Sequence, residues 1–124
     1  MKFLLPKKEW IVGDTIEGKV SITPHKNIEA TAVKVELVYL EFVPYGQGNR
    51  YEESVELELA QETQFQSGQP QLYPFRLTIP DPAPASAHYK NGSISWMLRG
   101  TLDRPRRVDT FLQEEVLVYP KLPE

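Results

Sequence analysis

Apolar and polar residues alternate with a period of two along most of the chain. In the segment 16–23, Ile16, Val20 and Ile22 share one face, and polar side chains occupy the other. This alternation predicts a strand with one buried face. The same pattern recurs at 54–61, 73–79, 92–103 and 114–119. A helical period of about 3.6 is not sustained over ten residues anywhere. The pattern therefore predicts an all-β protein.

The segment 29–43 is longer than an ordinary strand, and its apolar phase slips. The apolar positions on one face are Val33, Val35 and Leu37, and those on the other are Val38, Leu40 and Phe42. Two interpretations fit this slip. A bulge near Val38 would let a long strand bend from one sheet to another. Alternatively, the strand is buried on both faces.

Turn-forming residues separate the predicted strands at 13–14, 24–27, 44–49, 67–70 and 104–107. About seven or eight strands with frequent turns in 124 residues are typical of a two-sheet sandwich. We therefore expect an immunoglobulin-like β-sandwich of about seven or eight antiparallel strands. Residues 1–124 have the length of a single domain.

The strand 73–79 is followed by Pro80, Pro82 and Pro84. Proline has no backbone N–H and biases the preceding residue toward extended geometry, so these residues cannot lie inside a sheet. The sequence predicts that the chain leaves the sheet at Pro80, crosses one end of a sandwich as a stiff extended segment, and re-enters near Ser93. An ordinary proline-rich loop is the alternative.

Composition excludes several classes of function. With 14 basic and 17 acidic residues the net charge is −3, so we expect no nucleic-acid partner. There is no cysteine, which excludes disulfides and thiolate metal sites. The apolar run directly before Pro6 has only three residues, and no apolar run approaches the roughly 18 residues of a spanning helix. We expect a cytoplasmic protein with no membrane insertion.

Candidate catalytic chemistry is sparse. His25 and His88 lie in predicted loops, and neither has an acid or nucleophile at a motif spacing. We therefore predict no catalytic, cofactor-binding or metal-binding residue, and no enzyme. Asp81, Asp103 and Asp109 flank turns of the kind that supply calcium ligands in β-sandwich modules, although no Asp-x-Asp spacing occurs. A calcium- or carbohydrate-dependent ligand-binding module is the alternative function.

The densest positive charge lies in one predicted turn, and it comprises Arg99, Arg104, Arg106 and Arg107. The simplest interpretation is a solvated turn that discourages edge pairing. The functional interpretation is a landing site for an acidic or phosphorylated segment, because guanidinium groups bind oxyanions in bidentate fashion.

Four aromatic residues surround another turn, and they are Tyr39, Phe42, Tyr45 and Tyr51. Aromatic side chains at a loop tip form a plausible protein-contact surface, and they can equally cap the end of the core. Phe42, Tyr45 and Tyr51 are therefore candidate partner-binding residues, together with the four arginines.

Three landmarks resemble the amino-terminal half of the arrestin fold. They are WIVGDTIEGKVSI at 10–22, YPFRLTIPDPAPAS at 73–86, and ISWMLRGTLDRPRRVDTFLQEEVLV at 94–118. They occur in the order found in arrestins, in the related retromer subunits and in bacterial sporulation-control proteins. Those families usually carry two such sandwiches in tandem, whereas this chain has room for one. A second copy or another subunit would then supply the missing neighbour.

The resemblance implies a non-enzymatic adaptor or scaffold that binds a protein partner, or a second copy of itself, through a sheet face or an edge strand. The candidate edges are 1–5 and 116–119, since strand addition uses free main-chain groups. Gly18 lies in phase with buried positions, and we expect it to leave room for a bulky neighbour such as Trp96, as Gly100 does in its own strand. Simple bulges are the alternative for both glycines.

Overall fold

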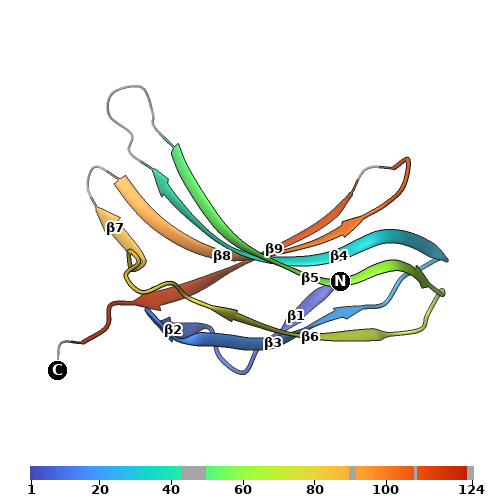
Figure 1. The fold of residues 1–124 in the computed structure, drawn as a ribbon, viewed down its shortest axis with the longest axis horizontal. Coiled ribbons are helices and arrows are strands. Elements are labelled where there is room, and N and C mark those ends of the chain that lie inside the picture. Colours follow the sequence, from blue (N-terminus) through green and yellow to red (C-terminus); the bar gives the residue numbers. More distant parts are fainter. Residues whose placement is uncertain (43–49, 90–91, 108, 123–124) are drawn as a thin grey trace.

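The fold is described by a computed structural model that covers residues 1–42, 50–89, 92–107 and 109–122, with the side chains of all of these except 50–54 and 89. The described residues form nine strands and no helix (Figure 1). In chain order the strands are β1 Lys2–Leu4, β2 Glu9–Ile11, β3 Thr15–Ile22, β4 Ile28–Phe42, β5 Arg50–Phe65, β6 Gln71–Thr78, β7 Ala87–Tyr89, β8 Gly92–Asp103 and β9 Thr110–Tyr119. The predicted all-β, two-sheet fold is confirmed.

The strands form a smaller sheet in the order β1-β3-β6 and a larger one in the order β2-β9-β8-β4-β5, with β7 also pairing with β8. All pairs are antiparallel except that of β2 with β9, where Trp10 lies opposite Val118. The larger sheet is strongly curved, so that the face turned away from the smaller sheet is concave (Figure 1). We call this face the outer face.

The core lies between the two sheets and receives alternate side chains from both. Its largest fully buried members include Trp96, Phe65, Ile16, Leu37 and Leu98. Burying a side chain of this size stabilises the fold by roughly 1.5–3 kcal/mol. The period-two pattern of the sequence is therefore the pattern of contact with this core.

The long strand β4 stays in one sheet and is buried on both faces. Its pairing with β8 runs without a shift, and Val38 lies opposite Met97 on the outer face. Even so, Val38 is 0% exposed. Side chains converge on a concave surface, and this convergence shields Val38 from water. The bulge predicted near Val38 is wrong, because the register with β5 shifts at Val33/Lys34 instead.

The proline segment crosses from the smaller sheet to the larger one, as predicted, but it re-enters at β7 and not near Ser93. β6 ends at Thr78, and β7 begins at Ala87. Between them the segment is fixed by the indole of Trp96, whose Nε1 donates to the Pro84 carbonyl at 2.8 Å. Ser86 anchors it to β9, since its N–H donates to the Val118 carbonyl at 2.7 Å and its hydroxyl accepts from the Val118 N–H at 3.0 Å.

Both in-phase glycines make room for the amino-terminal strand rather than for Trp96. A Cβ on Gly18 would lie 2.7 Å from Leu5 Cδ2 and 3.0 Å from Phe75 Cζ, and one on Gly100 would lie 3.3 Å from Phe3 Cζ. The ring of Phe3 also meets the edge of Phe75, with centroids 6.0 Å apart. The close neighbours of Gly18 thus come from β1, β6 and the residue after β1, so the expected Trp96 contact is corrected.

Replacing Gly18 with alanine should destabilise the sandwich by about 1–3 kcal/mol, because the added methyl group overpacks the site beside Leu5 and Phe75. Urea unfolding monitored by tryptophan fluorescence measures this loss. Gly100→Ala is the matched comparison and should lose less, since its nearest contact is longer. An equal or smaller loss at Gly18 would contradict the packing described here.

Candidate functional site

The described residues contain no group of three or more His, Cys, Asp or Glu side chains that could hold a metal ion. The three aspartates of the calcium alternative each have separate contacts. Asp81 lies 3.4 Å from Lys121 Nζ, Asp103 lies 3.2 Å from Lys34 Nζ, and Asp109 accepts from a backbone N–H at 3.2 Å. In the same described part of the chain, no helix is long and apolar enough to cross a membrane.

The edges of the sheets differ from those expected, and the larger sheet ends in β2 on one side and in the 16-residue strand β5 on the other. The predicted edge 116–119 belongs to β9, which lies between β2 and β8 and is no edge. At the true edge, β2, the Ile11 N–H donates to Asp14 Oδ2 at 3.0 Å, and the Ile11 carbonyl accepts from the Asp14 N–H at 2.8 Å. The predicted edge β1 exists but has three residues. Edge strand β6 carries Pro74, which lacks an N–H donor.

The outer face of the larger sheet gathers exposed apolar side chains. Of the nine exposed large hydrophobic residues within the described part, five lie on this face: Ile11, Phe42, Phe111, Leu117 and Tyr119. Phe111 is 59% exposed and Phe42 is 45% exposed. Ile11, Leu117 and Tyr119 lie close together on the adjacent strands β2 and β9, and an exposed apolar cluster marks an interaction site more often than an isolated exposed leucine does.

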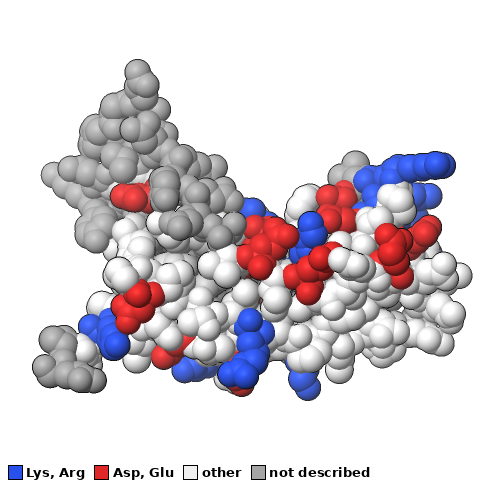
Figure 2. All heavy atoms as spheres, viewed as in Figure 1, with Lys and Arg blue, Asp and Glu red and all other residues white. Residues whose placement is uncertain are grey.

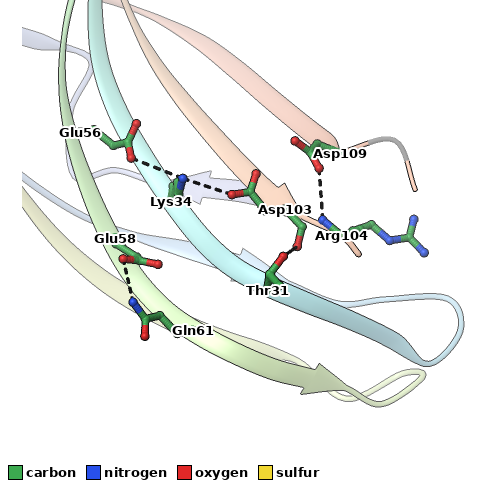
Figure 3. A network of polar contacts seen from close by, with 8 residues as sticks. All are labelled: Thr31, Lys34, Glu56, Glu58, Gln61, Asp103, Arg104 and Asp109. Carbon is green, nitrogen blue, oxygen red and sulfur yellow. Dashed lines mark hydrogen bonds and ion pairs between the residues drawn. The ribbon is translucent and has the colours of Figure 1, made fainter. Parts of the chain in front are cut away.

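Two cationic side chains between these apolar positions, Lys34 and Arg99, have polar partners. Lys34 Nζ lies 3.2 Å from Asp103 Oδ2 and 3.6 Å from Glu56 Oε1 (Figure 3). The hydrogen bond and the charge of Asp103 raise the pKa of Lys34 above its ordinary value of 10.5, and Glu56 adds to this effect. The guanidinium of Arg99 lies against Gln113, whose amide oxygen accepts at 3.0 Å from Nε once the amide is turned toward it. These pairs hold the side chains of the outer face in defined positions.

The four predicted arginines separate into two places. Arg99 lies in the middle of β8 on the outer face, opposite Glu36 of β4. Arg104, Arg106 and Arg107 lie in the turn between β8 and β9, where Lys and Arg side chains project from the end of the molecule (Figure 2). Only the latter three form the basic turn.

The basic turn has a defined backbone. The Arg107 N–H donates to the Arg104 carbonyl at 3.4 Å, and the Arg104 N–H donates to Asp109 Oδ1 at 3.2 Å. Arg106 adopts φ 58, in the left-handed region. For a residue with a Cβ this conformation costs roughly 1–2 kcal/mol. Glycine would adopt this backbone conformation at a lower energetic cost than the arginine that occupies the position.

The turn forms one wall of a pocket of about 250 Å³, which we call the basic pocket. Arg104, Pro105 and Arg107 line it on one side, and the segment from Lys26 to Glu29 lines it on the other. Sequence reasoning missed Lys26 and Asn27, because no local motif links this loop to a turn about eighty residues later. Their only signal is the polar stretch HKN that follows Pro24.

The aromatic candidates are only partly placed. Phe42 lies on the outer face, whereas Tyr45 and the side chain of Tyr51 fall outside the described residues. Tyr39 points to the inner side and packs on Trp96 with ring centroids 5.0 Å apart. Tyr39 thus belongs to the cap of the core, and Phe42 belongs to the exposed surface.

Residues 39–123, more than half of the chain, match the family model described as arrestin (or S-antigen), N-terminal domain. Among solved structures, the sporulation control protein Spo0M from Bacillus subtilis is similar, with a TM-score of 0.79 at 16% sequence identity. The likeness covers 94% of this chain and 47% of the Spo0M chain, so the chain spans about half the length of that protein. At this identity the likeness shows the fold alone. The comparison with curated proteins gave no match.

Replacing Lys34 with glutamine should lower the thermal stability at neutral pH and remove part of its decline in alkali. The raised pKa means that the folded chain holds the proton more tightly, so the stabilisation is present at neutral pH and is lost as the pH rises through the folded pKa above 10.5. Burial also raises the pKa of Tyr73, so part of the stability is lost in alkali in the parent chain and in the Lys34→Gln variant alike. The melting temperatures of the variant and the parent chain should therefore converge as the pH rises through this range.

Lys19→Gln is the control for this experiment, because Lys19 is exposed and has no ion pair with a described residue. Its difference from the parent chain should not change with pH. A Lys34→Gln curve that runs parallel to the parent curve into strong alkali would contradict the ion-pair account.

Arg106→Gly should stabilise the chain by about 0.5–1 kcal/mol, because glycine adopts the left-handed conformation without strain. The greater entropy of glycine in the unfolded state offsets only part of this gain. Chemical unfolding measures the gain. An Arg106→Ala variant removes the same side chain and keeps the strain, so it should gain nothing. Equal stability of the two variants would show that the φ of Arg106 costs nothing here.

Proposed function

Because this chain belongs to the family of arrestin N-terminal domains, we propose that it is a non-enzymatic protein-interaction module that binds a protein partner through the outer face of its larger sheet. The observation that carries the proposal is the concentration of exposed hydrophobic side chains on that concave face. Members of arrestin-like families generally act as adaptors, in agreement with this assignment.

The composition of the outer face supports this role. Protein interfaces are enriched in aromatic side chains and depleted of charge at their centres, with polar groups around them. Phe111 and Phe42 lie at opposite ends of the face, and Ile11 and Tyr119 lie side by side on β2 and β9. These are the positions at which a partner would gain most from burying apolar surface.

The fixed charges of the face support it as well. Lys34, Arg99 and their neighbours are already paired before any partner arrives. Side chains that are ordered in the free protein lose less conformational entropy on binding, so a preorganised face binds more tightly than a mobile one. The concave shape suits a partner with a convex or extended contact surface.

The extent of the module is part of the proposal. Residues 1–124 are treated as one sandwich domain, and Spo0M is about twice as long. A second copy of the chain, or a second sandwich in another subunit, is a candidate for the neighbour that would complete such an arrangement. Light scattering of the purified chain tests the homo-oligomer. A cytoplasmic location remains a prediction from the sequence.

Affinity capture from cells of the source organism, followed by mass spectrometry, tests the outer face. Phe111→Asp should weaken capture of the specific partner at least about tenfold, because it places a charge at an exposed apolar contact. Leu72→Asp is the matched control, since Leu72 is 53% exposed on the smaller sheet. Unchanged capture by Phe111→Asp, or equal loss by Leu72→Asp, would contradict the proposal.

A further inference from the structure

The longest described strand, β5, lies at the border of the larger sheet and pairs with β4 alone (Figure 1). From Arg50 to Glu58 its register with β4 runs without interruption, and we call this stretch of nine residues the β5 edge. No backbone hydrogen bond joins the β5 edge to any other described segment. In an antiparallel pair, alternate residues of an edge strand point their N–H and C=O groups away from the neighbouring strand. The β5 edge therefore presents a row of main-chain donors and acceptors to the surroundings.

The other strand edges carry features that discourage pairing with a further strand. Strand β1 has three residues, Pro74 lies within β6, and Asp14 engages the end of β2. Beyond the β5 edge, β5 itself is irregular, because its register with β4 shifts and Glu62 has φ 45, in the left-handed region. Bulges, prolines and short strands all oppose strand addition. The β5 edge contains neither a proline nor a register shift.

The inner side of the β5 edge borders an apolar pocket. Val55 pairs with Leu37 on the face turned toward the core, yet it remains 39% exposed. Both side chains line a pocket of about 90 Å³ together with prolines of the segment 80–84. This volume is roughly that of three water molecules, or of one small aliphatic side chain. A strand added beside β5 would direct every second side chain to this inner side, where the pocket can receive one of them.

The outer side of the β5 edge is acidic. Glu56 and Glu58 lie there, opposite Glu36 and Lys34 of β4 (Figure 3). Glu56 Oε1 lies 3.6 Å from Lys34 Nζ, and Glu58 Oε2 accepts from Gln61 Nε2 at 3.1 Å. A carboxylate accepts several hydrogen bonds at once, so these contacts leave room for a further donor on each glutamate. Three carboxylates beside one lysine give this side of the edge an excess of negative charge.

The charge of the β5 edge determines which kind of strand it favours. Four of its nine residues are glutamate and one is arginine. Two copies of this edge would bring like charges together across a new ladder, which is unfavourable, whereas oppositely charged cross-strand pairs are stabilising. The edge therefore disfavours a second copy of this chain and favours a basic strand.

We infer that the β5 edge accepts an extended segment of the partner protein as an additional strand, and that this segment alternates lysine or arginine with apolar residues. Main-chain hydrogen bonds hold the segment, and its alternate side chains supply the specificity. Its basic side chains lie beside Glu56 and Glu58, and its apolar side chains cover Val55 and the pocket. This inference rests on the proposed function in that the segment belongs to the protein partner, and it adds a contact at the border of the sheet.

The test is an NMR titration of the ¹⁵N-labelled chain with three capped nonapeptides. The first alternates lysine with valine, the second alternates glutamate with valine, and the third has the lysines and valines of the first in two separate blocks. We expect the alternating basic peptide to shift the amide signals of the β5 edge and to slow their hydrogen exchange, because the added strand covers the free N–H groups. The other two peptides should leave these signals unchanged. No response to the first peptide, or an equal response to the block peptide, overturns the inference.

Variants of the edge identify the side chains that matter. Glu56→Gln with Glu58→Gln should weaken binding of the alternating basic peptide about three- to tenfold, because two exposed ion pairs are lost. Glu9→Gln with Glu17→Gln is the matched control, since it removes the same charge from β2 and β3 and should bind as the parent does. Val55→Lys places a cation on the inner side of the edge and should abolish binding. Equal loss in the control, or full binding by Val55→Lys, contradicts the inference.

Capture from cells separates this inference from the proposed function. Loss of the partner by both Phe111→Asp and Val55→Lys supports the two together. Loss by Phe111→Asp with full capture by Val55→Lys removes the strand addition and leaves the module with its outer face. Loss by Val55→Lys alone supports the strand addition and removes the outer face as the main contact. Full capture by both variants removes both.

Discussion

The apolar layer between the two sheets holds this molecule together. Among the described residues no ladder of backbone hydrogen bonds joins the smaller sheet to the larger one, so their union depends on interdigitated side chains such as Phe3, Phe75 and Trp96. The proline segment strengthens the union, because it hydrogen-bonds to both Trp96 and Val118 as it crosses between the sheets. Close packing at Gly18 and Gly100 shows how little free space the layer leaves.

Curvature follows from this packing and shapes the surface that we assign to binding. The ends of the larger sheet bend away from the smaller sheet, and its outer face is therefore concave (Figure 1). On that face the centre is closed by converging side chains around Val38, while aromatic residues remain exposed toward its ends. A single sheet thus uses one face for folding and offers the other for contact with a partner.

The charged side chains of the outer face also differ from those at the end of the sandwich. On the outer face, Lys34 is paired and positioned between Asp103 and Glu56 (Figure 3). At the end of the sandwich, Arg104, Arg106 and Arg107 form no ion pair with a described residue, and Arg106 has an unfavourable backbone conformation. Paired charges contribute to the folded state.

Local periodicity and turn chemistry determined the all-β class, the proline crossover, the likeness to arrestins and the arginines of the basic turn, because each depends on residues close in the chain. Only the tertiary structure placed β2 outside β9, moved the register shift to Val33/Lys34 and brought Lys26 and Asn27 against Arg104. Strand order and sheet curvature arise from contacts between distant segments. Such contacts optimise the packing of the whole core, and no short stretch of sequence encodes them.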